Sequence, residues 1–558
     1  MKIALAQINP TVGDFTGNTQ KILEFAARAA EQGADLVVFP ELCVCGYPPA
    51  DFLEKTAFVD RAMQAVDEIA AWTGQPGRPA LLVGSVQHAG SAVGKRVSNV
   101  AAFLYAGKVA FVQQKMLLPF YDVFDEQRYF EPAVSQSITF LDEQPLAITI
   151  CEDAWNDKDF WPRQLYPVDP VNALMEQWQS NSPRFDLHPR IILNISASPF
   201  CQGKPAVRQN MLAAIAERHN AFVLLVNQVG GNDGLVFDGS SLLLDPTGTV
   251  VARAACFAED LVVVDIPHTT EAAPAPCDDT AEIWKALVVG TRDYVRKCGF
   301  SKVLVALSGG IDSALVAAIA VEALGGENVL GIGMPSEYSS LGSIDDARHL
   351  ARNLGIRFEL VPIHDVFAQF QKALEPLFRG TPFGLAEENI QSRTRGVLLM
   401  ALSNKFGALV LTTGNKSEMS VGYCTLYGDM VGALAVIGDV YKTRVYQLAH
   451  YANRDREIIP RNTIEKPPSA ELRPDQRDTD SLPPYEVLDP ILQAYVEGFL
   501  SAEQIAREQK IDLALVRSVL RLVEQSEYKR QQAAPVLKIT QKSFGTGRRF
   551  PIAVKVQV

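Results

Sequence analysis

The sequence contains no hydrophobic run long enough to cross a membrane. A membrane-spanning helix needs about 18 or more consecutive apolar residues, and no stretch of this chain approaches that length. The N-terminus, MKIALAQINP, has only a short apolar run before Gln7, which indicates a strand rather than a signal peptide. We therefore expect no membrane partner.

Paired cysteines and clustered histidines are also missing. The eight cysteines are scattered without the spacing of a zinc site or the density of a disulfide scaffold. Reduced thiols in the cytoplasm fit this pattern. Cys43 and Cys45 form a lone Cys-x-Cys pair, for which we expect buried structural side chains. None of the seven histidines belongs to a His-Glu-x-x-His motif, so structural histidines are expected.

The chain lacks an excess of positive charge. Its 52 Lys and Arg residues against 64 Asp and Glu residues give a net charge of −12, so we do not expect it to coat nucleic acid. The 558 residues, 47% of them hydrophobic and 21% charged, are typical of a globular protein. At roughly 150 residues per domain, about two to four domains are expected.

Short apolar strands alternate with helices and hairpins over the first 266 residues. The strand candidates are IALAQI, DLVVFPE, ALLVGSV, LAITICED, RIILNISAS and FVLLVNQVG. The periodicity also predicts a helix over residues 18–32. The residues on its apolar face are Ile22, Phe25, Ala26 and Ala29. The predicted hairpin turns are Ala106-Gly107 and Pro246-Thr247-Gly248. This mixture predicts an αββα sandwich, with two sheets face to face and helices outside.

Residues 269–279 are rich in Pro, Ala and Thr and are predicted to link a domain of residues 1–268 to one of residues 280–558. In the second domain the strand candidates are VLVALSGG, NVLGIGMPS, FELVPI and GALVLTTGN. Helical segments such as residues 343–354 separate them. This alternation of strands and helices predicts a doubly wound parallel sheet with its ligand at the C-terminal ends of the strands. Residues 465–490 contain six prolines and are predicted to be mobile.

Three predicted strands of the N-terminal domain end in a reactive side chain. Glu41 follows LVVFP, Lys115 follows FVQQ, and Cys151 follows AITI. A thiol with a pKa of about 8.5 is a poor nucleophile at neutral pH. A lysine that favours the thiolate and a glutamate that moves the proton would activate it. Taken singly, a capped carboxylate, a surface lysine and a buried thiol are the alternatives.

Together the segments FPEL, K-x-x-L-P and CED resemble the nitrilase-type amidase family over roughly residues 1–266. The resemblance implies that Glu41 is the general base, that Lys115 is the lysine of the catalytic set, and that Cys151 forms a thioester with an amide substrate and releases ammonia.

The same resemblance implies that Tyr121, Ser198 and Lys204 hold the amino-acid end of the substrate, L-glutamine. The charge of Lys204 suits an α-carboxylate. A turn-capping Ser198 and a solvated surface position for Lys204 are the alternatives.

A Gly-rich turn joins a strand to a helix in VLVALSGGIDSAL. The start of a helix leaves backbone N–H groups unpaired at the positive end of its dipole, so phosphate is the expected ligand. The residues predicted to hold this phosphate are Ser308, Gly309, Gly310, Ile311, Asp312 and Ser313. Asp312 would repel phosphate unless a cation lies between them, which indicates Mg²⁺. No lysine follows Gly310, so this is not the common P-loop.

The SGGIDS segment resembles the pyrophosphate loop of the ATP-pyrophosphatase superfamily. The resemblance implies that the six residues from Ser308 to Ser313 bind ATP. NIQSRTRG, TTGNKSEMSVGYCTLYGD and DVYKT resemble the ligand segments of NAD synthetases in order and spacing. With the amidase half, the whole chain resembles the glutamine-dependent NAD synthetase family. The resemblance implies that ATP adenylates the nicotinate carboxylate of deamido-NAD and that ammonia from glutamine displaces AMP.

The resemblance also assigns roles in the second domain. Thr413 and Lys442 are expected to bind ATP, and Lys442 would neutralise the departing pyrophosphate. Asp312 and Glu418 are expected to hold Mg²⁺ on the ATP phosphates. The residues expected to contact deamido-NAD are Asn389, Arg393, Glu418 and Lys529. For Asn389, Arg393 and Lys529, a surface or capping role is the alternative.

Three other readings stay open at this point. The chain could be an amidotransferase that adenylates another acceptor, an RNA-modifying enzyme with the same loop, or a non-enzymatic scaffold. Acidic net charge and the absence of a Cys-x-x-Cys sulfur relay weigh against the second, and two complete reactive sets weigh against the third. Enzymes with two coupled sites often assemble symmetrically, so a homo-oligomer is expected.

Overall fold

The computed structural model describes residues 1–90, 92–269, 278–473 and 476–555. The chain divides into two compact units, Met1–Asp278 and Asp279–Val558. Most of the predicted linker, residues 270–277, lies outside the described residues. Within the described residues, every helix is too short or too polar to span a bilayer.

The first unit contains two six-stranded sheets. In sheet order, the first consists of β14 (Asp260–Asp265), β1 (Lys2–Gln7), β2 (Leu36–Val38), β3 (Ala80–His88), β4 (Val97–Tyr105) and β5 (Lys108–Gln114). The second consists of β13 (Val250–Arg253), β12 (Leu242–Leu244), β9 (Phe222–Asn227), β8 (Ile191–Ser196), β7 (Gln144–Ile150) and β6 (Thr139–Leu141). A small ribbon joins β10 (Val229–Asn232) to β11 (Leu235–Asp238).

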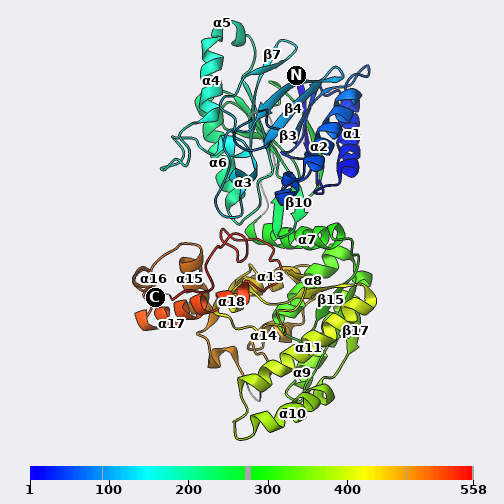
Figure 1. The fold of residues 1–558 in the computed structure, drawn as a ribbon, viewed down its shortest axis with the longest axis vertical. Coiled ribbons are helices and arrows are strands. Elements are labelled where there is room, and N and C mark those ends of the chain that lie inside the picture. Colours follow the sequence, from blue (N-terminus) through cyan, green and yellow to red (C-terminus); the bar gives the residue numbers. More distant parts are fainter. Residues whose placement is uncertain (91, 270–277, 474–475, 556–558) are drawn as a thin grey trace. The chain divides into compact units, whose positions relative to one another are not determined.

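Alternation along the strands builds two layers of core. Ile3 and Leu5 of β1 pack in one buried cluster with Leu193 of β8, between the sheets. Ala4, on the opposite face of β1, packs in the cluster that includes the helices outside the first sheet. The helices α1 (Phe15–Glu31) and α2 (Thr56–Trp72) cover the first sheet, and α4 (Pro170–Ser180) and α6 (Lys204–His219) cover the second (Figure 1). The predicted αββα sandwich is confirmed.

Local capping moves some predicted boundaries. The first helix begins at Phe15 rather than residue 18, because the Asp14 side chain accepts a hydrogen bond from Gly17 N and caps it. Its predicted apolar face is buried, and both predicted hairpins form. Cys43 and Cys45 are fully buried, as expected. The remaining short elements of this unit are η1 (Ala50–Glu54), α3 (Glu126–Tyr129), η2 (Cys151–Ala154) and α5 (Ser182–Phe185).

The second unit is built on a parallel five-stranded sheet. In sheet order its strands are β17 (Arg357–Leu360), β16 (Val329–Gly333), β15 (Val303–Ala306), β18 (Leu409–Thr412) and β19 (Leu434–Ala435). The chain first runs outward from β15 to β17 and then crosses to β18 on the other side of β15. The strand order therefore reverses between β15 and β18, where ligands bind in such sheets.

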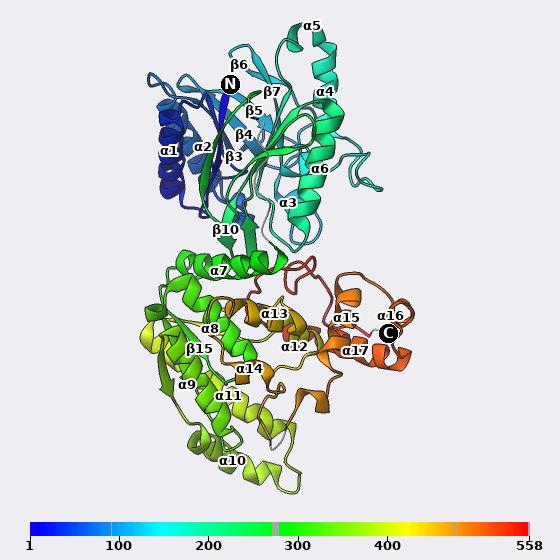
Figure 2. The same cartoon turned by 180° about the vertical axis from the view of Figure 1, so that it is seen from behind.

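Helices cover both faces of this sheet, which confirms the doubly wound prediction. Leu399 of α11 (Leu385–Phe406) packs with Leu304 and Ile332 on one face, and α8 (Ile311–Leu324) packs on β15 and β16 (Figure 2). The other helices are α7 (Asp279–Lys297), η3 (Gly326–Asn328), α9 (Leu341–Leu354), α10 (His364–Phe378), α12 (Lys416–Val421), α13 (Lys442–Ala452), α14 (Arg461–Glu465), η4 (Asp478–Asp480), α15 (Tyr485–Val496), α16 (Ala502–Gln509), α17 (Leu513–Gln525) and α18 (Glu527–Arg530).

The described part of residues 465–490 is bonded to neighbouring helices. Lys466 Nζ lies 3.0 Å from Asp346 of α9. The Glu471 carboxylate accepts a 2.7 Å hydrogen bond from Ser343 Oγ, also of α9. The mobility of this segment stays a prediction.

Gly84 of β3 lies against the loop that carries Glu41. A Cβ atom at this position would be 2.3 Å from Leu42 N and 2.5 Å from Pro40 O. Gly84→Ala should therefore displace that loop, lower the free energy of unfolding by about 1–3 kcal/mol and lower amide hydrolysis about ten-fold or more. Thermal unfolding and glutamine hydrolysis measure the two effects. Gly90→Ala is the control because its Cβ would meet nothing within 4 Å; equal behaviour of the two variants would contradict the packing argument.

Candidate active sites

The three reactive residues of the first unit meet inside the sandwich. Glu41 lies in the turn after β2, Lys115 follows β5, and Cys151 directly follows β7. Glu41 and Lys115 are fully buried, and Cys151 is 4% exposed. The Lys115 Nζ atom is 2.7 Å from Glu41 Oε1. The sequence-predicted set is thus brought together from three strand ends.

The Glu41 carboxylate is held from several directions. Asn99 Nδ2 donates to Oε1 at 2.7 Å, and the backbone N–H of Ala197 donates to Oε2 at 2.9 Å. With the Lys115 ammonium also bonded to Oε1, both oxygens have donors. This arrangement fixes the orientation of the group expected to move the proton.

Glu126 of α3 is a second carboxylate on the same lysine. Its Oε1 and Oε2 atoms lie 2.9 and 2.8 Å from Lys115 Nζ, and its Oε1 accepts a 2.9 Å bond from the Tyr47 hydroxyl. Burial raises the pKa of Glu126 to about 7, while the Lys115 charge acts in the opposite direction. Sequence reasoning missed Glu126 because α3 is a single helical turn without a periodic pattern.

The folded chain disfavours the thiolate form of Cys151. Burial raises the pKa of the thiol above its ordinary value, and the Glu41 charge adds to this, while the Lys115 charge opposes it. The Lys115 charge does not outweigh burial, so the lysine by itself does not produce the expected thiolate. Cys151 has a φ of 44°, a left-handed conformation that often marks a functional position.

Asp153 ties the Cys151 turn to the segment after Lys115. Its Oδ1 accepts hydrogen bonds from the backbone N–H groups of Met116 at 3.0 Å and Leu117 at 2.8 Å. Its Oδ2 accepts one from Ile150 N at 3.1 Å. One buried carboxylate thus joins the strand ends that carry the thiol and the lysine.

Two of the residues predicted to bind glutamine, Tyr121 and Lys204, lie near a further carboxylate, Glu152. The hydroxyls of Tyr121 and Tyr166 donate to it at 3.0 and 3.1 Å. Burial raises the pKa of Glu152, while the Lys115 charge, these two hydrogen bonds and the Lys204 charge act in the opposite direction. Lys204 Nζ donates to the Pro199 carbonyl at 2.9 Å and lies 5.5 Å from a ring centre of Trp155. Ser198 is 2% exposed, and its N–H donates to Asn227 Oδ1 at 2.9 Å.

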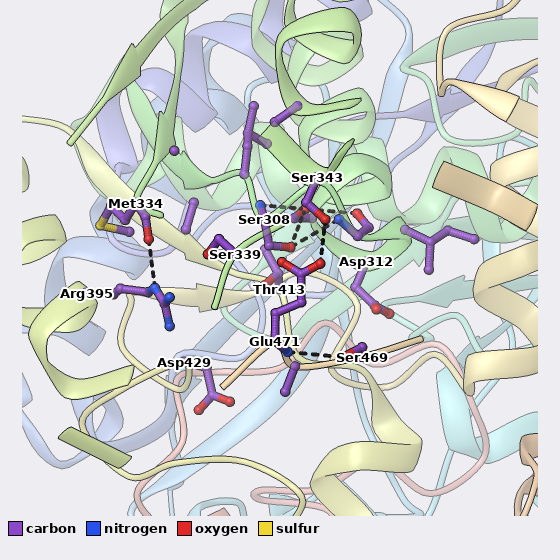
Figure 3. Close-up of a pocket in the computed structure, with 18 of the residues that line it drawn as sticks. Ser308, Asp312, Met334, Ser339, Ser343, Arg395, Thr413, Asp429, Ser469 and Glu471 are labelled. Atoms are coloured by element: carbon purple, nitrogen blue, oxygen red, sulfur yellow. Dashed lines mark hydrogen bonds between the residues drawn. The ribbon is translucent and has the colours of Figure 1, made fainter. Parts of the chain in front are cut away.

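A cavity of about 300 Å³ opens at the C-terminal ends of β15, β16 and β18 in the second unit. Figure 3 shows Ser308, Asp312 and Thr413 around it. The predicted ATP-binding residues that line it are Ser308, Gly310, Ile311, Asp312, Ser313, Thr413 and Lys442. The cavity lies at the point where the strand order reverses.

The phosphate loop depends on close backbone approach. Gly309 has a φ of 79°, and a Cβ there would be 2.3 Å from Ser343 O at the start of α9. Gly310 caps α8 without a side-chain hydrogen bond, which leaves the first N–H groups of the helix for an anion. Ser308 Oγ lies 3.3 Å from Ser313 Oγ, so two hydroxyls border the same turn.

A buried lysine also joins the two predicted metal ligands. The Lys442 ammonium bonds to Asp312 and lies 3.4 Å from Glu418 Oε1. Asn415 donates to Asp312 Oδ1 at 2.9 Å, and its side chain accepts from Glu418 N as the cap of α12. Burial raises the pKa of Glu418 to about 8, against the Lys442 charge.

The other residues predicted to bind deamido-NAD meet on one loop, residues 422–426. Lys529 Nζ donates to the carbonyls of Gly422 and Cys424 at 2.7 and 2.8 Å. Arg393 Nε donates to the Leu426 carbonyl at 3.2 Å, and Asn389 Oδ1 accepts from Thr425 Oγ1 at 2.9 Å. These three side chains do not line the described cavity, whereas Glu418 does.

Comparisons with known proteins cover both units. Residues 2–275 match the carbon-nitrogen hydrolase family and residues 283–533 match NAD synthase. A glutamine-dependent NAD(+) synthetase of Synechocystis sp. is 48% identical over 99% of this chain and 98% of its own, and one of Thermotoga maritima is 42% identical over the same shares. The chain belongs to the glutamine-dependent NAD(+) synthetase family. A solved member from Acinetobacter baumannii, in complex with ADP, is 40% identical with a TM-score of 0.75 and covers 99% of this chain and 98% of its own.

Sequence analysis did not name several cavity residues of this family member. Arg395 donates from Nε to the Met334 carbonyl at 3.0 Å (Figure 3), and burial lowers its pKa to about 10. Glu471 and Asp478 come from the proline-rich segment and also line the cavity. Arg395 lies in the NIQSRTRG segment, whose resemblance to a ligand segment did not single it out. No local pattern in the proline-rich segment indicates that Glu471 and Asp478 face a cavity.

The donor set at Asp312 and Glu418 is compatible with Mg²⁺. Both side chains offer carboxylate oxygens, the ligands that Mg²⁺ prefers, and both line the cavity beside the predicted phosphate loop. Among the described residues, no three His, Cys, Asp or Glu side chains are arranged to hold a metal by themselves. The remaining ligands would then be phosphate and water oxygens.

Glu126→Gln should lower the rate of glutamine hydrolysis roughly 100-fold, because a neutral amide no longer orients the Lys115 ammonium beside Glu41. Protonation of Glu126 has the same effect, so the wild-type rate should fall as the pH drops through about 7, and the variant should lack that step. Glutamate release as a function of pH measures both.

Exposed Glu143 provides the control. Glu143→Gln should keep the wild-type rate and pH profile. An unchanged pH step in the Glu126 variant would show that another group titrates there.

Proposed function

We propose that this chain makes NAD(+) from deamido-NAD, ATP and glutamine, with ammonia passing from the first reaction to the second. The observation that carries the proposal is that one chain with full-length similarity to this family holds both a buried Glu41–Lys115 pair beside Cys151 and an SGGIDS loop at the rim of a cavity. The proposal assigns amide hydrolysis to the first unit and adenylation to the second.

In the first reaction, Cys151 Sγ attacks the carboxamide carbon of glutamine while Glu41 takes the thiol proton. The C–N bond then breaks, and the same proton goes to the leaving nitrogen, which departs as ammonia. Water attacks the thioester with Glu41 as base, the C–S bond breaks, and glutamate leaves with the thiol restored. These steps start from a protonated thiol, and Glu41 is the base that accepts its proton.

Two charges near Cys151 match the two charges of glutamine. The Glu152 carboxylate, with Tyr121 and Tyr166, would accept the α-ammonium group. Lys204 would bind the α-carboxylate as a point charge, with Ser198 held nearby by Asn227. Together these side chains orient the carboxamide toward the thiol.

In the second reaction, the nicotinate carboxylate of deamido-NAD attacks the α-phosphorus of ATP and pyrophosphate leaves. Ammonia then attacks the carbonyl carbon of the adenylate and AMP leaves. The loop from Ser308 to Ser313 would hold the phosphates, Thr413 would hydrogen-bond ATP, and Lys442 would neutralise the pyrophosphate.

Asp312 and Glu418 would hold Mg²⁺ at the phosphates. When bound, the metal supplies charge neutralisation and orients the phosphate oxygens. The loop of residues 422–426, with Asn389, Arg393 and Lys529 attached to it, would place deamido-NAD beside Glu418.

A homo-oligomer is part of the proposal. The helices α10 and α11 lie side by side in the second unit (Figure 1) and expose large apolar side chains. These are Val366, Phe370, Leu377, Leu385, Val397, Met400 and Phe406. Exposed apolar side chains concentrated on two adjacent helices suit an interface between copies.

The deciding assay supplies glutamine, ATP, Mg²⁺ and deamido-NAD and follows NAD(+), AMP and pyrophosphate. Cys151→Ala should abolish synthesis from glutamine, because no thioester forms, and should keep synthesis from ammonia within about two-fold. Retained use of glutamine by the variant would contradict the nucleophile assignment. Pyrophosphate release with another acceptor, but not with deamido-NAD, would favour a different amidotransferase.

Val397→Glu should reduce the oligomer to smaller species, because it places a charge on an apolar face that is 64% exposed in the single chain. Light scattering after size exclusion measures the mass. Val134→Glu, at a position 98% exposed in the first unit, should leave the mass unchanged. A wild-type chain that is monomeric at all concentrations would refute the proposed assembly.

A further inference from the structure

Lys416 is a fully buried lysine that does not line the cavity. Its Nζ atom lies 2.9 Å from Asp439 Oδ1 and 3.0 Å from Glu497 Oε1. It also donates to Thr540 Oγ1 at 2.6 Å and to the Lys542 carbonyl at 2.8 Å. A buried ammonium with this many partners is held in one place.

The partners of Lys416 come from segments far apart in the chain. Asp439 precedes α13, Glu497 ends α15, and Thr540 lies in the C-terminal segment. Asp439 Oδ2 also accepts from the backbone N–H groups of Ile539 and Thr540, both at 2.7 Å. The C-terminal segment, residues 539–542, is therefore bonded to both the lysine and the aspartate.

Two of these segments lead directly into the adenylation site. Lys416 is the first residue of α12, which contains Glu418, and Asp439 precedes Lys442, the first residue of α13. The backbone N–H of Lys416 donates to the Val440 carbonyl at 2.9 Å. The Lys416–Asp439 pair thus sets how far apart the starts of α12 and α13 lie.

Every charged group in this cluster has a bonding partner when the cluster is complete. One ammonium faces two carboxylates, and the Tyr441 hydroxyl donates to Glu497 at 2.8 Å while Thr540 Oγ1 donates to Asp439 at 2.9 Å. A buried network with every member bonded is rigid, and loss of one partner leaves a charge exposed to apolar surroundings. Movement of either segment would separate Glu418 from Lys442.

We propose that Lys416 is a positioning residue, which together with Asp439 and residues 539–542 holds Glu418 and Lys442 in register for adenylation. This inference rests on the proposed function of that site. It adds to that function a dependence on the C-terminal segment.

The test compares two substitutions of Thr540 in the full chain, with ammonia as nitrogen donor and saturating deamido-NAD. Thr540→Val keeps the size and removes the hydroxyl; it should lower kcat roughly ten-fold with the KM for ATP within about two-fold. Thr540→Ser keeps the hydroxyl and removes the methyl group; it should retain kcat within about two-fold. A purely packing role predicts the reverse order.

The controls separate positioning from unfolding and from failure of the proposed function. Thr546→Val makes the same chemical change at an exposed position just after residues 539–542 and should keep the wild-type kcat. Lys416→Met should lower kcat roughly 100-fold or more, with glutamine hydrolysis unchanged. Equal kcat for the Val and Ser variants of Thr540, or an effect on KM alone, would overturn the inference. A wild-type chain that forms no NAD(+) from ammonia would overturn the proposed function and the inference with it.

Discussion

A buried lysine shared by two carboxylates is the arrangement on which each reactive region depends. Lys115 lies between Glu41 and Glu126, and Lys442 lies between Asp312 and Glu418. Removal of one partner from a buried ion pair typically costs about 3–5 kcal/mol, because the remaining charge has no water around it. The carboxylates and the ammonium must therefore stay together, which keeps the reacting groups in a fixed geometry.

The third lysine of this kind, Lys416, lies between Asp439 and Glu497 and differs in purpose. Lys416 does not line the described cavity, and its partners are structural segments rather than groups expected to meet a substrate. We therefore propose that the same charge pattern serves chemistry in two places and geometry in one. Lys416 differs from Lys115 and Lys442 because its ammonium joins structural segments, whereas theirs join groups expected to react.

Burial changes the chemistry expected at Cys151. The Lys115 charge favours the thiolate, but burial and the Glu41 charge raise the pKa of the thiol, and Lys115 is also bonded to two carboxylates. The thiol therefore needs a base at the moment of attack, and Glu41 has the position for that role. Ammonia released there is mostly ammonium in neutral water, so its transfer to the adenylate benefits from exclusion of water.

The sequence by itself determined the strands, the sheet classes and the reactive residues at strand ends, because alternation of apolar residues and short motifs are local signals. Glu41, Lys115 and Cys151 could be named in this way, as could Asp312 in its Gly-rich turn. Only the tertiary structure decided which distant side chains pair with the buried charges of these residues. No local pattern marks Glu126, which lies on a single helical turn, or Thr540, which is over 120 residues from Lys416. Each has its role because the folded chain places a buried charge beside it.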